Sequence, residues 1–366
     1  MFLAFTGIID PYGVSPIHVF WPGVNQYKPQ RINIDRLIKP YEVWKYQPRT
    51  VFMGTSRIQQ SIDPSVLDRT SYAPAYNASI PASTLKMNVS HLRRYIELDS
   101  RLQTVVVELF LYNFIGKNEE KAPERFVDFL TNTVSLFAST DALQASFQTL
   151  SYNLLNGQNP TYEIKPSGHF YYPPGHNAKA TFDTFASEIW KLHQTRAGWI
   201  FNEPAFDSVR EIIEICHDYK LNLIFLLTPN HIYDDYYIDK IGAWKIVEEW
   251  LRRVSADALV YSFSQPNSWV DEPVKENMRY WNDPYHFSLV MGRAIELGLL
   301  GEQDGGIPKG FMIHMTPDKV LEHVESRKQA VRSWELENAY FGREFEKQKQ
   351  KWELSHASAK KDESPN

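Results

Sequence analysis

The feature that most constrains the fold is a regular alternation of short apolar runs with longer segments of helical spacing. The apolar runs cover residues 50–53, a short stretch ending at 77, and residues 104–111, 221–227 and 258–263. The helical segments cover residues 83–98, 205–220, 238–254 and 289–299. Strands that alternate with helices are typical of a parallel sheet with helices on both faces. The sequence therefore predicts a three-layer α/β/α domain, doubly wound around a mainly parallel sheet of five strands.

This α/β domain is expected to cover only part of the chain. The predicted organisation is an extended N-terminal arm (1–48) with a short helix at 34–44, the α/β domain (49–310), a charged, exposed helical tail (311–355) and a disordered end (356–366). Residues 117–200 interrupt the alternation. They are predicted to form an insertion with helices at 125–137 and 141–155 and a proline-rich aromatic loop at 157–176.

The first nine residues are apolar, but nine residues are less than half of what spans a bilayer. The segment also lacks the basic start and the cleavage site of a signal peptide. Two interpretations stay open. Either the segment is part of the arm, or it is the remaining end of a longer membrane anchor.

Composition excludes some classes of partner. The net charge of −5, with 39 basic and 44 acidic residues, offers no positive surface for nucleic acid. The single cysteine, Cys216, lies in a helical pattern and is expected to be a buried structural thiol, so no internal disulfide can form. Aromatic residues make up 14% of the chain, which suits either a carbohydrate-facing surface or an aromatic core.

Two short motifs carry the candidate chemistry. Gly54-Thr55-Ser56-Arg57 directly follows the first apolar run, which places Ser56 at the end of a strand, where α/β sheets place their functional residues. Asp283 and His286 lie three residues apart, near enough for one loop to hold a carboxylate against an imidazole. A serine, a base and a group that orients the base are the requirements of nucleophilic catalysis.

Other polar residues are weaker candidates. Arg57 could bind an anionic group beside Ser56, or it could form a structural salt bridge. His231 follows the fourth predicted strand and could line the same cleft, or it could be a loop histidine. His169, His176 and His193 match no standard metal site, so neither a metal nor another cofactor is expected.

The motifs resemble those of the SGNH or GDSL-type serine hydrolases. That resemblance rests on Gly54-Thr55-Ser56-Arg57, on residues 76–83, on the valine-rich run at 104–111 and on Asp283-Pro284-Tyr285-His286. The most similar branch contains bacterial proteins of cell-surface polysaccharide O-acetylation and teichoic acid D-alanylation. The resemblance covers residues 45–115 and 220–300 and implies a flavodoxin-like sheet.

The resemblance also implies roles for individual residues. Ser56 would be the nucleophile, His286 the base and Asp283 its orienting partner. Asn77 and Ser79 stand where the family has an Asn and an oxyanion-binding glycine. The family's later Gly-x-Asn-Asp block has no counterpart here, and Asn113 lies about three residues late for the oxyanion-binding Asn.

The function implied by this resemblance is that of a serine esterase or O-acyltransferase. Its substrate would be a polysaccharide or an acylated sugar, with residues 170–172 as a hypothetical sugar platform and a membrane-bound acyl-transfer protein as a further partner. The alternative is a non-catalytic binding or assembly component of a polysaccharide biosynthesis or export system. The expected location is the cell envelope, on the periplasmic or extracellular side, with the cytoplasm as the other compartment left open.

Overall fold

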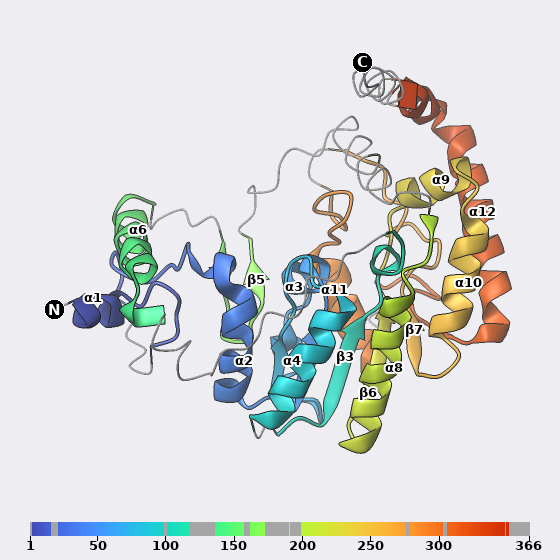
Figure 1. Cartoon of the computed structure of the whole chain (residues 1–366). Helices are drawn as coiled ribbons and strands as arrows, with labels where there is room; N and C mark the ends of the chain where they lie inside the picture. Colours follow the sequence, from blue (N-terminus) through green and yellow to red (C-terminus); the bar gives the residue numbers. More distant parts are fainter. Residues whose placement is uncertain are drawn as a thin grey trace, which may run out of the picture. The chain divides into compact units, whose positions relative to one another are not determined.

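The computed structural model describes residues 2–15, 21–98, 101–116, 136–156, 162–172, 190, 199–275, 278–302, 306–347 and 349–350. The protein is α/β, with a mainly parallel six-stranded sheet in the order β2-β1-β3-β6-β7-β8 (Figure 1). These strands are β1 (Thr50–Met53), β2 (Ala75–Asn77), β3 (Thr104–Glu108), β6 (Asn222–Leu227), β7 (Val260–Ser262) and β8 (Ile313–Met315). The five predicted strands are confirmed, although β3 ends three residues early.

The sixth strand corrects the prediction of a helical tail that begins at residue 311. β8 pairs antiparallel with β7, with Tyr261 opposite His314. The segment enters the sheet because Phe311, which precedes β8, is buried and packs against Phe263 with ring centroids 5.5 Å apart. Three or four apolar residues beside a highly charged segment were too short a signal to predict a strand.

Most of the predicted helices lie close to their predicted positions. They are α1 (Phe2–Ile9), α2 (Asp35–Tyr46), α3 (Ser56–Ser61), α4 (Leu85–Glu97), α6 (Thr140–Asn156), α8 (Glu203–Asp218), α9 (Ile232–Lys240), α10 (Trp244–Val254), α11 (Leu289–Leu299) and α12 (Val320–Glu337). The predicted helix at 238–254 is divided into α9 and α10 at Gly242, whose φ of +69° a helix cannot continue. In the described part of the chain, no helix has the length and apolarity needed to cross a membrane.

The chain divides into two compact units. The first comprises Met1–Val106, Glu120–His176 and Glu211–Asn222, and the second comprises Val107–Glu119, Asn177–Arg210 and Leu223–Asn366. The division falls inside β3. The domain boundaries expected at residues 49 and 310 stay a prediction.

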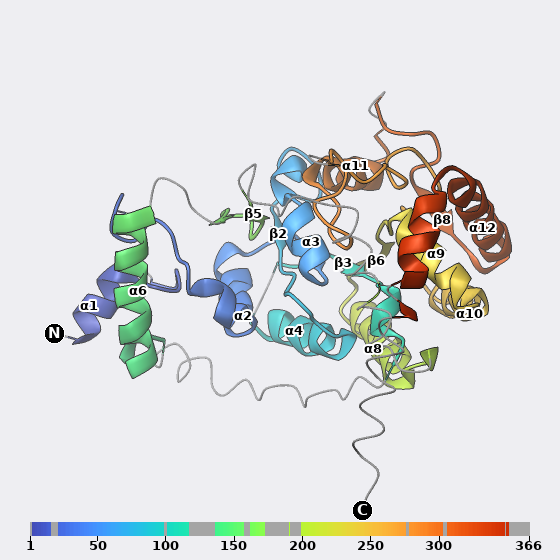
Figure 2. The same cartoon turned by 90° about the horizontal axis from the view of Figure 1, so that it is seen from above.

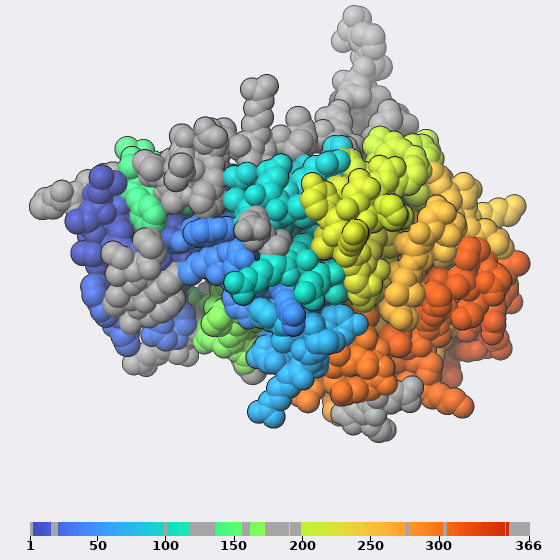
Figure 3. All heavy atoms as spheres, turned by 90° about the horizontal axis from the view of Figure 1, so that it is seen from below, coloured from blue at the N-terminus to red at the C-terminus, as the bar shows by residue number. Residues whose placement is uncertain are grey.

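In the first unit, the N-terminal segment is helical where an extended arm was expected. The Thr6 hydroxyl of α1 donates to the carbonyl of Phe137 at 2.7 Å, and Phe5 packs against Phe147 of α6 with ring centroids 5.1 Å apart. The two helices lie side by side in Figure 1 and form adjoining surfaces in Figure 3. Phe5 and Ile9 of this apolar segment are thus used for packing within the unit, whereas Leu3 and Ile8 are exposed.

Helix α2, predicted at 34–44, contains a proline without losing its regular form. Pro40 has no N–H to give to the carbonyl of Arg36, four residues earlier. The ring of His91 on α4 takes that place, with Nε2 at 3.1 Å from the Arg36 oxygen. A donor from a neighbouring helix therefore satisfies the carbonyl that the proline leaves open.

The aromatic loop of the predicted insertion forms a hairpin, β4 (Glu163–Ile164) with β5 (Phe170–Tyr171). Its turn lies against β2, since the Asn77 N–H donates to the Ser167 carbonyl at 2.8 Å. Gly168 has φ +80°, and a Cβ there would lie 2.5 Å from the Asn77 carbonyl, so only glycine fits. Phe170 is fully buried, which corrects its assignment to an exposed platform. The predicted helix at 125–137 falls almost wholly outside the described residues.

In the second unit, α12 is not the exposed helix that its charges suggested. One face is buried and includes Val324, Val331 and Trp334. Trp334 packs against Tyr233 of α9 at 4.8 Å between ring centroids. The helix lies beside α9 and α10, as Figure 2 shows. Charged residues are as numerous as apolar ones along α12, and the spacing of the apolar ones is sufficient for packing. The predicted disordered end lies outside the described residues.

Candidate active site

Ser56 lies in the first unit, at the start of α3 and three residues after Met53, the last residue of β1. It is half-buried. Thr55 is the N-cap of α3 and accepts the Arg57 N–H at 3.3 Å through its hydroxyl. The Gly54 carbonyl accepts the Ile80 N–H at 3.0 Å and the Ser83 hydroxyl at 2.7 Å. These bonds hold the turn that presents Ser56.

Asn77 holds α3 in place. The Asn77 side chain is fully buried, and its amide donates to the carbonyls of Ile58 and Ile62 at 2.9 Å each. Its Oδ1 accepts the Ser79 N–H at 3.2 Å, and the Ser79 hydroxyl donates to the Phe52 carbonyl. Asn77 therefore links β2 to the helix that carries Ser56. The predicted oxyanion role of the Ser79 N–H requires that its bond to Asn77 open.

Asp283 and His286 meet in the second unit, as their spacing predicts. His286 Nδ1 lies 2.6 Å from Asp283 Oδ2. Asp283 Oδ1 accepts the N–H groups of Tyr285 at 2.8 Å and of His286 at 2.9 Å. The carboxylate is thus fixed by the backbone of its own loop, and it can receive a proton-bearing Nδ1. In a neutral imidazole with Nδ1–H, the basic lone pair is on Nε2.

The electrostatics of Asp283 suit this orienting role. Burial alone would raise the pKa of the Asp283 carboxyl, but the hydrogen bond and charge of His286 and the two backbone N–H groups outweigh it. The pKa is held below its usual value. Asp283 therefore stays an anion through neutral pH.

The loop around this pair is closed by the backbone. Trp281 and Phe287 form an antiparallel bridge, and the Asn282 N–H donates to the His286 carbonyl at 2.8 Å. The Glu272 carboxylate, which is 4% exposed, accepts the N–H groups of Arg279 and Tyr280 at 3.0 and 2.8 Å. The sequence analysis did not identify Glu272, because its partners lie seven and eight residues away in irregular structure.

His231 has a structural role, which corrects its assignment to the cleft. It is fully buried at the N-cap of α9, where Nδ1 accepts the Tyr233 N–H at 3.2 Å. Nε2 then carries the proton and donates to the Glu272 carbonyl at 2.9 Å. Burial lowers the pKa of His231 to about 3.

The remaining candidates are distributed over both units. Arg57 is 3% exposed in the first unit, and Asn113 is half-buried at the end of a 3-10 turn, Leu111–Asn113, in the second. Ser56 belongs to the first unit and the Asp283–His286 pair to the second. The structure brings together the predicted base and its orienting acid, and the predicted nucleophile stays a prediction.

The residues that the structure covers include one of the three histidines considered as metal ligands and the single cysteine. Among them, no cluster of three or more His, Cys, Asp or Glu side chains could bind a metal ion. His169 Nε2 lies 3.0 Å from the Gln60 carbonyl, while His176 and His193 lie outside the described residues. Cys216 is buried, which raises the pKa of its thiol to about 12.

A group of buried charges in the first unit was not predicted from the sequence. Arg31, Asp35 and Lys39 follow one another at intervals of four residues and are all at most 8% exposed. Asp35 accepts the Gln59 amide of α3 at 2.7 Å, and the Lys39 ammonium donates to the Asn77 carbonyl at 2.7 Å. Their spacing on one helical face, beside the buried Ile38 and Val43, was the signal available in the sequence.

Comparison with known proteins gives only a distant structural similarity. No family model and no curated protein matches the chain. A solved structure described as "a putative platelet activating factor from Streptococcus pneumonia" has 13% sequence identity, covering 74% of this chain and 96% of that one. The TM-score is 0.33, which is too low to support an argument about fold or function.

Proposed function

We propose that this protein is a serine esterase or O-acyltransferase of the SGNH type, acting on acyl esters of a cell-surface or exported polysaccharide. The observation that carries the proposal is the 2.6 Å contact between His286 Nδ1 and Asp283 Oδ2, with the carboxylate fixed by two backbone N–H groups. This is the arrangement that orients a histidine base. The position of Ser56 after the carboxyl end of β1 supports it as the nucleophile.

In the proposed reaction, Ser56 Oγ attacks the ester carbonyl while His286 Nε2 accepts the hydroxyl proton. Asp283 stabilises the imidazolium that forms. The tetrahedral intermediate collapses when the imidazolium gives its proton to the departing sugar hydroxyl, which leaves the acyl group on Ser56. Water or a second sugar hydroxyl, deprotonated by His286, then attacks the acyl-enzyme and releases Ser56.

The hydrogen bonds of Asn77 and Ser79 favour a second candidate. Both residues use their donors inside the protein, which is the arrangement expected of a fold that binds without catalysing. The alternative function is a non-catalytic binding or assembly component of a polysaccharide system. It differs from the first in predicting no covalent chemistry at Ser56.

Hydrolysis of p-nitrophenyl acetate by the full chain separates the two. For an enzyme, Ser56→Ala should reduce hydrolysis to the level of the uncatalysed reaction. Asp283→Asn should reduce kcat by about 10³-fold to 10⁴-fold, because it favours the wrong tautomer of His286. The matched control is Ser65→Ala, since Ser65 is an exposed serine in the same unit. It should keep full activity.

Labelling with a fluorophosphonate gives an independent readout. Ser56 should be modified in the wild type and in Ser65→Ala, and the label should be lost in Ser56→Ala and weakened in Asp283→Asn. Equal inertness of wild type and Ser56→Ala, together with an unlabelled Ser56, would exclude the enzyme and favour the binding component. Acetate released from an O-acetylated polysaccharide, compared with a de-acetylated one, tests the substrate class.

The same proposal places the protein in the cell envelope, with a membrane-bound protein as the source of the acyl group. Fractionation of producing cells should find the chain in the envelope fraction. Recovery of the chain from the cytoplasm alone would contradict the proposed location. It would not bear on the chemistry of Ser56, which the hydrolysis and labelling assays test.

A further inference from the structure

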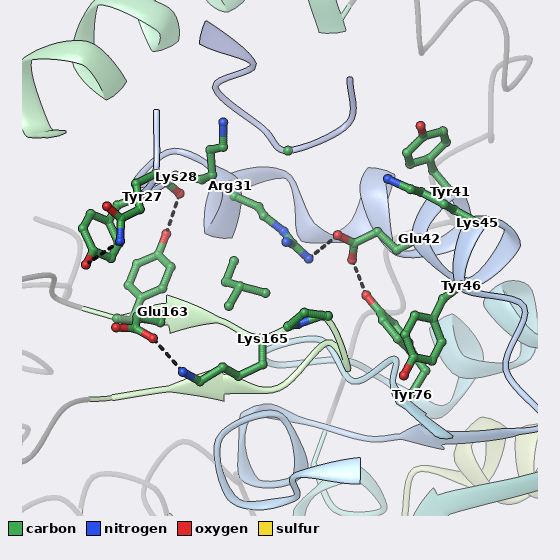
Figure 4. Close-up of a pocket in the computed structure, with 15 residues that line it drawn as sticks. Tyr27, Lys28, Arg31, Tyr41, Glu42, Lys45, Tyr46, Tyr76, Glu163 and Lys165 are labelled. Carbon is green, nitrogen blue, oxygen red and sulfur yellow. Dashed lines mark hydrogen bonds and ion pairs between the residues drawn. The ribbon is translucent and has the colours of Figure 1, made fainter. Parts of the chain in front are cut away.

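The first unit contains a cavity of about 460 Å³. Its walls come from the segment before α2, from α2 itself, from Tyr76 of β2 and from the β4–β5 hairpin (Figure 4). The volume is within the range of small-molecule sites. Neither Ser56 nor any other predicted catalytic residue lines it.

The charged residues that line the cavity are mainly cationic. They are Lys28, Arg31, Lys45 and Lys165, against the carboxylates Glu42 and Glu163. Both carboxylates are already paired, because Glu42 forms an ion pair with Arg31 and Glu163 lies 2.7 Å from the Lys165 ammonium (Figure 4). Beyond these two ion pairs the walls carry two further cations, which are Lys45 and Lys28, and the Lys28 ammonium lies 3.9 Å from Asp10 Oδ2.

Two lysines differ in what they offer to such an anion. The Lys28 ammonium donates to the Ile9 and Asp10 carbonyls at 3.0 and 2.6 Å, and burial lowers its pKa to about 8. Among the residues that the structure describes, no carboxylate lies within ion-pair distance of the exposed Lys45 at the rim. A negative charge in the cavity would compensate Lys45 and stabilise the charged form of Lys28.

Arg31 provides a second, independent indication of a ligand. It is 8% exposed, and its Nε has no hydrogen-bond partner in the described part of the chain. The Asp35 Oδ1 atom lies 4.0 Å from Nε, which is beyond hydrogen-bond reach. A buried guanidinium N–H without an acceptor is costly. An oxygen atom of a ligand in this cavity would supply the acceptor.

The remaining walls are rich in tyrosine, with Tyr27, Tyr41, Tyr46, Tyr76 and Tyr162 lining the cavity. Two of these rings are held firmly. The Tyr76 hydroxyl donates to Glu42 at 2.5 Å, and Tyr162 stacks on the buried Phe170 with 5.5 Å between ring centroids. Tyrosine combines a flat apolar face with a polar edge. Rigid tyrosines therefore suit a ring that has C–H faces and hydroxyl edges.

We propose that this cavity binds a saccharide that carries a carboxylate or phosphate group. A cationic ligand is disfavoured by the four cationic side chains, and a purely apolar one by the charged walls. No residue of the proposed catalytic site lines the cavity. Binding is therefore tested in Ser56→Ala protein, so that its outcome is separate from that of the esterase assays.

The test is isothermal titration of full-length Ser56→Ala protein with four probes: digalacturonic acid, glucose 6-phosphate, maltose and inorganic phosphate. We expect at least one of the two acidic sugars to bind at least about tenfold more tightly than maltose and more tightly than inorganic phosphate, a difference of roughly 1.4 kcal/mol. Whichever acidic sugar binds identifies the carboxylate or the phosphate as the preferred group.

Lys45→Gln provides the critical variant, because this side chain is exposed and its replacement should not affect folding. It should weaken binding of the acidic sugar about fivefold to tenfold and leave maltose unchanged. Lys86→Gln is the control and should bind as before, because Lys86 is a half-buried lysine of the same unit that pairs with Glu211 and does not line the cavity. Equal affinity for acidic and neutral sugars, no binding at all, binding of inorganic phosphate as tight as that of glucose 6-phosphate, or an unaffected Lys45→Gln would each overturn the proposal.

Discussion

The buried imidazole of His231 should make the folded protein less stable at acidic pH. Replacing His231 by Asn should remove this part of the pH dependence of stability. His231 is fully buried, donates to the Glu272 carbonyl and caps α9, and its pKa is lowered to about 3 by burial. In the unfolded chain a histidine titrates near pH 6.5, or about 3.5 units higher. Between those two values the unfolded state binds a proton that the folded state does not.

The sign and size of the effect follow from this difference. The free energy of unfolding should decrease as the pH falls through this window, by about 1.4 kcal/mol per pH unit. At pH 5 the loss from His231 should be about 2 kcal/mol relative to neutral pH. His323, whose pKa burial lowers to about 4, should add a loss of the same sign and similar size at pH 5.

The assay is urea unfolding followed by circular dichroism at pH values from 5 to 7.5. Asn retains an acceptor for the Tyr233 N–H but loses the ring that packs on Trp281 at 5.1 Å, so stability at pH 7.5 should fall by about 1–3 kcal/mol. The informative quantity is the slope below pH 6.5, which should decrease by about 1.4 kcal/mol per pH unit. His217→Asn, whose side chain is 88% exposed, should keep the wild-type slope. An unchanged slope in His231→Asn would refute the reasoning.

Two further predictions concern stability. Gly168→Ala should destabilise the protein by about 3 kcal/mol, because its Cβ would meet the Asn77 carbonyl at 2.5 Å with φ at +80°. Gly7→Ala, with open space around it in α1, should instead stabilise by about 0.5–1 kcal/mol in the same urea unfolding, and the reverse order would contradict the model of the turn. Burial raises the pKa of Asp271 to about 7, so the folded state keeps a proton that the unfolded state loses above about pH 4. Stability should therefore decline as pH rises from 4 to 7, and Asp271→Asn should be more stable than wild type at pH 8 by about 1–2 kcal/mol, after discounting for partial solvent exposure, with little difference at pH 4. An advantage that is the same at both pH values would contradict this assignment.

The alternation of strands and helices was predictable from sequence because it depends on local spacing. α11 occupies the residues predicted for it, and β1 and β6 agree closely with the runs of apolar residues that predicted them. Burial on both faces of a parallel sheet requires such continuous apolar runs. The contact between Asp283 and His286 was also predictable, since side chains three residues apart can meet in a single loop.

Features that depend on distant partners were not predictable in this way. β8 forms a strand because it pairs with β7. One face of α12 is buried because α9 and α10 pack against it. His231 is a cap because the Glu272 carbonyl, 41 residues later in the chain, accepts its proton. None of these distant partners can be recognised from the pattern of apolar residues around β8, α12 or His231 in the sequence.

The sequence by itself determined the α/β class, the order of most elements and the local pairing of a candidate base with its acid. Only the tertiary structure decided which polar side chains form hydrogen bonds and ion pairs inside the protein. Asn77 is hydrogen-bonded to α3 and Lys39 to the Asn77 carbonyl, whereas Arg31 is paired with Glu42 while its Nε has no acceptor among the described residues. The physical reason is that secondary structure follows from short-range spacing, whereas burial, hydrogen-bond satisfaction and pKa depend on atoms that only folding brings together.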